Sequence, residues 1–186
     1  LGLSSAASDV YKRQNKGGAY EETAVLYRSN AQSRAIEEAL LRISIPYRIY
    51  GGLRFYERLE IKNAIAYLRI IFNNNDNPSF ERSISNPTRG VGEKTLGKIR
   101  NTAKKYNISY IKASAKLIDE GSISGRGGSG LRDYLEFVAG CKNFIEENNL
   151  SELMELIIKE SGLYAYHAKE AGEKGKTRTE NLEELI

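Results

Sequence analysis

Residues 86–96 read NPTRGVGEKTL and place two glycines around one apolar residue, between two stretches with helical spacing. Glycines let the main chain approach a partner closely. The N–H groups at the start of the second helix attract a phosphate. The residues that this hypothesis assigns to a nucleic-acid backbone are Thr88, Arg89, Gly90, Val91, Gly92, Lys94 and Thr95. Such contacts read no bases and weaken with salt; a plain tight turn between two helices explains the glycines equally well.

A second group of this kind lies at residues 50–58, YGGLRFYER, where two glycines precede Arg54, Phe55 and Arg58. Close main-chain approach, cationic groups and stackable rings suit a single-stranded nucleic acid. The alternative is a turn followed by core aromatics. Phe55 and its neighbour Tyr56 cannot easily both be buried, because neighbours on a helix point apart.

Arg28, Ser29 and Asn30 follow a short apolar run that is typical of a strand. In open α/β sheets, ligands bind at the carboxyl ends of strands, so these side chains are suited to hold phosphate or sugar. Helix capping by Ser29 or Asn30 is the simpler interpretation, and the pattern alone favours it.

Other chemistry finds little support in the sequence. Residues 172–177, GEKGKT, end like a phosphate loop, but Glu170 stands where that motif needs a glycine, and no strand precedes it, so we expect a basic loop. The single cysteine, Cys141, and the single histidine, His167, cannot form a disulfide or a Cys/His metal site within one chain. No pair of acidic residues stands out as an acid/base couple.

Periodicity indicates the elements that must position these residues. Strands are predicted at 23–27 and 47–50 and helices at 31–43 and 58–72, the order of an α/β sheet with helices on it. Residues 73–78, NNNDNP, indicate a linker or a domain boundary. After it we expect only helices, separated by a hairpin at 86–92, a flexible glycine loop at 121–130 and a basic loop at 172–179; the helices are predicted at 80–85, 93–106, 108–119, 131–147, 151–160 and 162–171.

The composition of the chain limits the classes of protein to which it can belong. The chain has 186 residues, a net charge of +4 and a pI near 9.0, which permits an anionic partner without requiring one. No apolar run is long enough for a bilayer, and low cysteine use with no signal peptide favours the cytoplasm. Residues 1–14 show no period and no caps, so we expect a non-native leader there.

Three of these segments together resemble one family. Residues 24–71, from AVLYRSNAQSR to AIAYLRII, resemble part of the second RecA-like motor domain (2A) of UvrD/Rep/PcrA helicases. NPTRGVGEKTL resembles the glycine hairpin of the helical domain inserted in that motor (2B), and GEKGKTRTENLEEL resembles the end of the same domain. The resemblance implies a partial α/β RecA-like piece at 15–75 followed by an all-α 2B-like domain at 76–186, mostly helical overall.

The resemblance also implies a function for the parent protein: a superfamily 1 motor that hydrolyses ATP with Mg²⁺ and moves 3′ to 5′ on single-stranded DNA in repair or replication. In that scheme Arg28, Arg54 and their neighbours lie near the single strand, and residues 88–95 grip the duplex. The family's ATP-hydrolysing motifs are not found in this sequence, so we expect the chain by itself to be inactive. Two alternatives stay open: a subunit of a recombination helicase–nuclease, and a non-catalytic scaffold that binds proteins.

Overall fold

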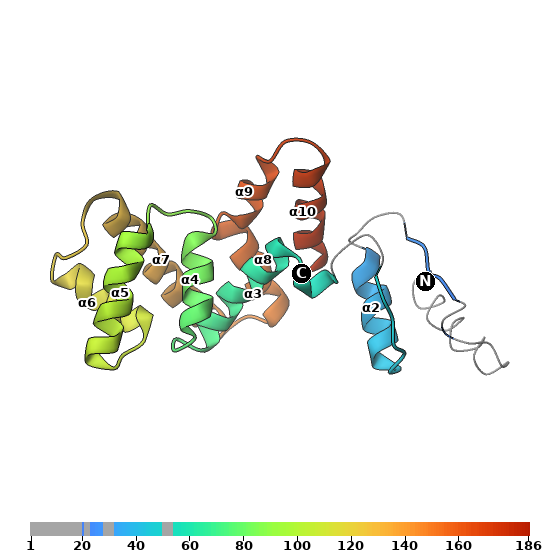
Figure 1. The fold of residues 1–186 in the computed structure, drawn as a ribbon, viewed down its shortest axis with the longest axis horizontal. Helices are drawn as coiled ribbons and strands as arrows, with labels where there is room; N and C mark the ends of the chain where they lie inside the picture. Colours follow the sequence, from blue (N-terminus) through green and yellow to red (C-terminus); the bar gives the residue numbers. More distant parts are fainter. Residues whose placement is uncertain (1–19, 21–22, 28–31, 50–53) are drawn as a thin grey trace.

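A computed structural model describes residue 20 and residues 23–27, 32–49 and 54–186. The regular structure of these ranges is helical (Figure 1). Its elements are α2 (Ser33–Arg42), the 3₁₀ turn η3 (Phe55–Glu57), α3 (Leu59–Phe72), α4 (Asn77–Ser85), α5 (Glu93–Tyr106), α6 (Tyr110–Asp119), α7 (Gly125–Phe144), α8 (Leu150–Glu160), α9 (Leu163–Ala168) and α10 (Glu173–Glu184).

The predicted α/β portion is wrong. Residues 23–27 and 45–49 form no strand, and no sheet occurs in the part of the chain that is described. A strand needs a neighbour for its main-chain N–H and C=O groups, and these two segments have none among those residues. Their apolar side chains pack on helix α2 instead: Val25 and Tyr47 lie against a small cluster whose buried members are Ile36, Leu40 and Ile45.

Helices α3 to α10 share one large hydrophobic core. Tyr67 lies near its centre on α3, fully buried, with its ring 6.1 Å from that of Tyr134 on α7. The Tyr67 hydroxyl donates to the main-chain oxygen of Ser83 at 2.7 Å, and the Ser83 hydroxyl lies 2.6 Å from that of Tyr134. Buried hydroxyls that satisfy one another in this way fix α3, α4 and α7 in one arrangement.

The linker predicted at residues 73–78 joins α3 to α4. Asp76 caps α4, because its carboxylate accepts the main-chain N–H of Ser79 at 3.0 Å, and Pro78 occupies the first turn, where a missing N–H costs nothing. Helices α3 and α4 bury their apolar faces in the same core. The segment is therefore a helix connection inside one packed unit.

Two predicted loops are partly helical, and those predictions were wrong in extent. The glycine run at 121–130 begins helix α7 at Gly125, and the basic run at 172–179 lies largely in α10, which begins at Glu173. Glycine is a poor helix former, so tertiary packing must supply the stability there. At Gly175 a β-carbon would overlap the main-chain oxygen of Glu170, which shows how closely α10 approaches the end of α9.

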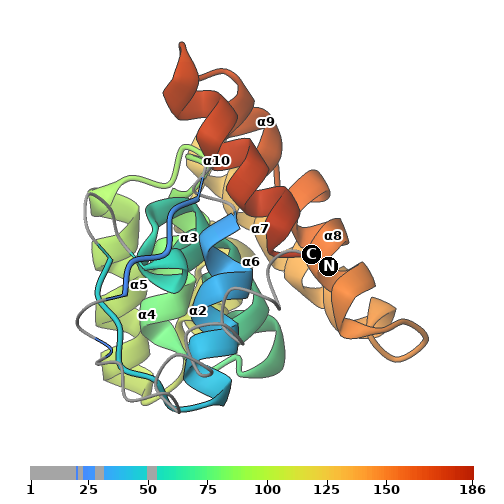
Figure 2. The ribbon, with the colours of Figure 1, turned by 90° about the vertical axis from the view of Figure 1, so that its right-hand side faces the viewer.

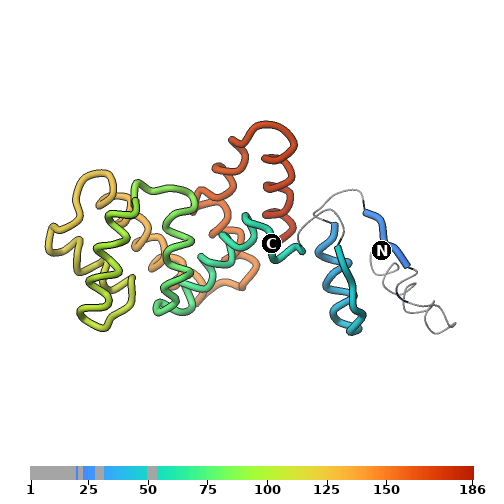
Figure 3. Tube along the Cα trace, in the orientation of Figure 1, coloured from blue at the N-terminus to red at the C-terminus, as the bar shows by residue number. Residues whose placement is uncertain are grey.

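Helix α2 and its cluster lie at one end of the elongated molecule, beyond the start of α3 (Figures 1 and 3). Helix α10 returns the chain to the start of α3 and lies beside α9 (Figures 1 and 2). No described helix has the length and apolar character needed to cross a membrane.

Candidate nucleic-acid interface

The predicted glycine hairpin is present as a tight connection between α4 and α5. Gly90 has a φ of +74°, a left-handed conformation that favours glycine, and Gly92 is the N-cap of α5. Val91 between them is buried and packs into the main core. The apolar residue thus anchors the loop, while both glycines stay at the surface.

Arg89 is held by the protein itself. Its guanidinium donates to the main-chain oxygens of Pro87 at 2.9 Å and Ser161 at 2.8 Å. It also lies over the rings of Tyr67 and Tyr134, at 5.5 and 5.6 Å from their centroids, in cation–π contact. In this arrangement Arg89 braces the hairpin from within and presents little of its charge to a ligand.

Helix α7 backs directly onto the hairpin. A β-carbon at Gly127 would lie 3.0 Å from the main-chain oxygen of Gly90, and one at Gly130 would overlap that of Arg89. The glycine run therefore lets two main chains meet where side chains would keep them apart. An open hollow lies beside this contact, lined by Thr88, Arg89, Arg126, Ser129, Gly130 and Asp133.

Helix α5 carries the positive charge of the site. Its sequence EKTLGKIRNTAKKY holds five basic residues and one acidic residue, a net charge of +4. Lys94 is exposed in the first turn, and no side chain caps the helix N-terminus. Unsatisfied main-chain N–H groups at such a start favour an anion. The carboxylate of Glu93 faces along the helix and pairs with Arg100.

The salt bridge between Arg100 and Glu81 supports the hairpin from outside. The Arg100 Nε lies 2.6 Å from the Glu81 carboxylate, which connects α5 to α4. Hydrogen bonding to Arg100 holds the pKa of the Glu81 carboxyl below its ordinary value, against the opposing effect of burial. The pair is therefore charged at neutral pH and connects α4 to α5 across the outside of the hairpin.

The predicted single-strand group divides between surface and interior. Arg54 is exposed, with its guanidinium 5.4 Å from the centroid of the Tyr47 ring. Phe55 is fully buried in the main core, and Arg58 is 8% exposed. Tyr56 points outward at 43% exposed, as expected for a neighbour of a buried ring. The surface that this group offers a ligand is therefore that of Arg54 and Tyr56.

The other predicted single-strand residues, Arg28, Ser29 and Asn30, lie outside the described residues, as does the predicted leader at 1–14. Arg126 and Ser129 were missed by the prediction, which treated their segment as a loop. The usable signal was the cluster of glycines in that segment, because glycines on two elements often mark a close approach of main chains.

No described group of histidine, cysteine or acidic side chains could hold a metal ion. The GEKGKT segment forms the start of α10, with Gly175 packed against main-chain oxygens, so this arrangement offers no cradle for a phosphate. The basic hairpin is the site that the described residues form best.

The hairpin and the basic helix α5 together form a surface of the kind that suits a nucleic-acid backbone. The model of the UvrD-like helicase C-terminal domain matches residues 3–122, and the chain belongs to that family. It is 47% identical over 93% of its length to DNA helicase II of Escherichia coli (strain K12), and 39% identical over 94% to the ATP-dependent DNA helicase PcrA of Leuconostoc citreum. It spans 24% and 23% of those proteins, about a quarter of their length.

Proposed function

We propose that this chain is part of an ATP-dependent 3′–5′ DNA helicase, in which it contributes contacts to single-stranded and duplex DNA during repair or replication. Its family membership and the names of its relatives, DNA helicase II and ATP-dependent DNA helicase PcrA, support the proposal. The observation that carries the DNA-binding part is the hairpin, where Lys94 is exposed beside the uncapped start of α5.

Duplex DNA is the ligand that suits the hairpin. Two surface glycines, a helix start and exposed basic groups recognise phosphates rather than bases. The open hollow beside Thr88 adds Arg126 to the same face. Arg54 and Tyr56, near α2, are the described side chains available for a single strand.

ATP and Mg²⁺ belong to the proposed parent helicase. The described residues include no group of histidine, cysteine and acidic side chains that could hold the metal, and the GEKGKT segment, which starts α10, offers no loop for the ATP phosphates, so these residues do not fit either group. We propose residues 15–75 as the part associated with motor domain 2A and 76–186 as the inserted domain 2B. Helix α3, from the first part, buries its face in the core of the second.

The proposal is tested by fluorescence anisotropy of the full chain with a duplex that carries a single-stranded tail, across a salt series. We expect binding that is independent of base sequence and falls steeply with salt. Lys94→Ala should lower the affinity and reduce the slope of log K against log salt by about 1, the change for one lost phosphate contact. Lys142→Ala, an exposed lysine of α7, is the matched control.

A folded chain that fails to bind at low salt would refute the DNA-binding role and favour a protein-binding scaffold. Equal losses for Lys94→Ala and Lys142→Ala would show that binding reflects overall charge and would reject the hairpin as its site. The alternative of a helicase–nuclease subunit predicts the same DNA binding and is decided by whether the whole protein has a nuclease domain.

A further inference from the structure

The described hydrophobic core is divided into two clusters. The larger comprises residues of η3 and α3 to α10, and the smaller comprises residues of α2 together with Tyr20, Val25, Tyr27, Ile45 and Tyr47. Polar contacts join α2 to η3: the Glu37 carboxylate accepts the main-chain N–H of Phe55 at 3.2 Å, and the Tyr56 hydroxyl donates to Glu38 at 2.8 Å. Hydrogen bonds are directional, so this polar seam between α2 and η3 sets the orientation of one element relative to the other, which apolar contacts do not.

Arg58 extends this seam to the opposite end of the sequence. One guanidinium nitrogen donates to the Ser33 hydroxyl, the first residue of α2, at 2.7 Å. Another donates to the Asn181 side-chain oxygen on α10 at 2.8 Å. The guanidinium also lies 5.2 Å from the centroid of the Phe55 ring. A planar fork with fixed donor directions is well suited to hold two elements at a set angle.

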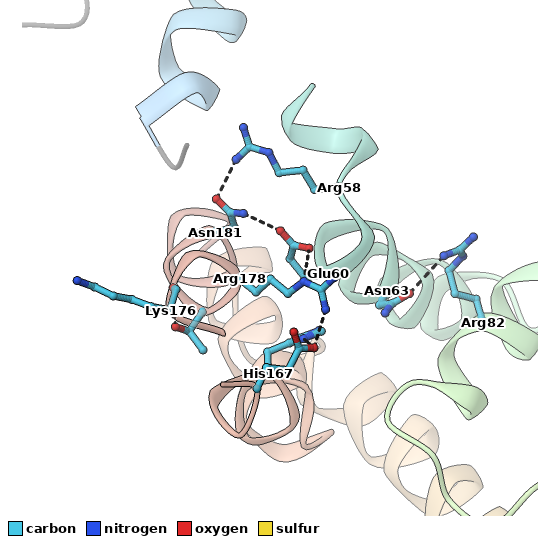
Figure 4. A network of polar contacts seen from close by, with 10 residues as sticks. Arg58, Glu60, Asn63, Arg82, His167, Lys176, Arg178 and Asn181 are labelled. Carbon is cyan, nitrogen blue, oxygen red and sulfur yellow. Dashed lines mark hydrogen bonds and ion pairs between the residues drawn. The ribbon is translucent and has the colours of Figure 1, made fainter. Parts of the chain in front are cut away.

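Asn181 in turn connects α10 to α3. Its amide nitrogen donates to the Glu60 carboxylate on α3 at 2.6 Å, and Arg178 on α10 lies 3.6 Å from the same carboxylate (Figure 4). Asn181 is 1% exposed and Glu60 4%. Removing one member of a buried polar group leaves its partners unsatisfied, so these contacts stabilise the packing of α10 against the start of α3.

We infer that Ser33, Arg58, Glu60 and Asn181 form a polar joint that sets the orientation of α2 relative to the helical unit carrying the hairpin, with Arg58 as its central positioning residue. Arg58 thus belongs to the joint rather than to the DNA-contacting surface, because its side chain is 8% exposed and two of its guanidinium nitrogens bind Ser33 and Asn181. Its consequence for DNA rests on the proposed function: the joint holds the α2 unit, which contacts Tyr56 through Glu38 and Arg54 through Tyr47, in line with the duplex-binding hairpin.

Double electron–electron resonance tests the joint by measuring the distance between two nitroxide labels. The labels are attached at Arg42→Cys on α2 and Lys176→Cys on α10, two exposed positions, in a Cys141→Ser background. Ser33→Ala removes only the acceptor on α2, and Arg58→Lys keeps the charge but cannot span both partners. Each should broaden the distance distribution about 1.5-fold, as expected when a local contact opens without global unfolding. Ser122→Ala, an exposed serine on the α6–α7 connection, should leave it unchanged.

Circular dichroism and the melting temperature of each variant establish that the fold is intact. Distributions as narrow as the parent's in folded Ser33→Ala and Arg58→Lys would overturn the joint. Asn181→Ala provides a third variant, which cuts the connection at α10, and it should broaden the distribution at least as much as Ser33→Ala does.

A second measurement separates the joint from the proposed function. With the joint loosened, we expect the affinity for the tailed duplex to fall about three- to tenfold, because ordering two units costs entropy on binding, while blunt-duplex affinity stays unchanged. A parent chain that binds neither DNA refutes the proposed function and leaves the distance result to decide the joint. A broadened distribution with unchanged tailed-duplex affinity would overturn the aligning role in DNA binding.

Discussion

Arg89 of the hairpin donates a hydrogen bond of 2.8 Å to the main-chain oxygen of Ser161, which directly follows helix α8 and lies 72 positions further along the chain. The bond crosses from the α4–α5 hairpin to the α8–α9 connection. An arginine next to a glycine turn looks like a phosphate ligand in the sequence. In the structure it shapes the turn that presents Lys94 and Thr88.

Arg89→Ala should therefore lower the free energy of unfolding by about 2 kcal/mol, because it removes charge-assisted hydrogen bonds and leaves main-chain oxygens without a donor. Arg89→Lys should recover only part of the loss, since one ammonium cannot span Pro87 and Ser161. Urea unfolding followed by circular dichroism measures both. Arg132→Ala, an exposed arginine of α7, is the control, and a loss for Arg89→Ala no larger than the control's would show that the brace contributes little.

Gly130→Ala should destabilise the chain by about 2 kcal/mol, because the new methyl group would overlap the main-chain oxygen of Arg89 and push the hairpin from α7. Gly140→Ala, on the same helix with nothing within 4 Å of the added carbon, should instead raise stability by up to about 1 kcal/mol through helix propensity. Thermal melts of the pair give the comparison. Stabilisation by both substitutions would mean that the hairpin and α7 are not in close contact.

Local sequence pattern was sufficient to predict the positions of most of the helices. The prediction of 93–106 coincides with α5, and that of 58–72 differs from α3 by one residue, because apolar residues recur at helical spacing on one face. The two predicted strands failed because a run such as TAVLY satisfies a strand pattern and a packing role against a helix equally well. Only a ladder partner distinguishes them, and that depends on tertiary structure.

Local sequence pattern could not predict which arginines are exposed and which are enclosed by other side chains. Arg54 and Arg58 are four positions apart, yet one is exposed and the other is enclosed by Ser33 and Asn181. Asn181 is 123 positions from Arg58, so no window of sequence contains the pair. The glycine run before Leu131 was predicted as a loop because its helical conformation depends on close packing against Gly90, which is also distant in the sequence.

Cys141 should be unreactive in the folded chain at pH 8. Burial raises the pKa of its thiol to about 11, so the reactive thiolate is scarce, and the side chain is 1% exposed. A folded pKa above the unfolded value means that this group's contribution to stability is complete below about pH 9 and is lost as the pH rises towards 11. As the single cysteine, it gives a clean signal with Ellman's reagent.

The measurement compares the labelling rate of Cys141 in buffer with the rate in urea at about 8 M, which unfolds the chain. We expect labelling in buffer to be slower by about a hundredfold or more, limited by opening of the fold. Gly130→Ala, which loosens the packing of α7, should accelerate it, whereas Gly140→Ala should not. Rapid labelling of the folded parent chain at pH 8 would show that α7 is not packed in the core around Cys141.

Arg126→Ala should weaken binding of the chain to duplex DNA by about three- to tenfold and lower the salt slope by about 1, because Arg126 is exposed beside Thr88 on the hairpin face. Arg132→Ala, further along α7, removes the same charge away from the hollow and should have a smaller effect. The protein's overall attraction for DNA falls equally in both variants, so the difference between them isolates position. Equal affinities would remove Arg126 from the interface and restrict it to the start of α5, whereas an additive loss in the Lys94→Ala/Arg126→Ala double variant would place the two side chains on separate phosphates of one duplex.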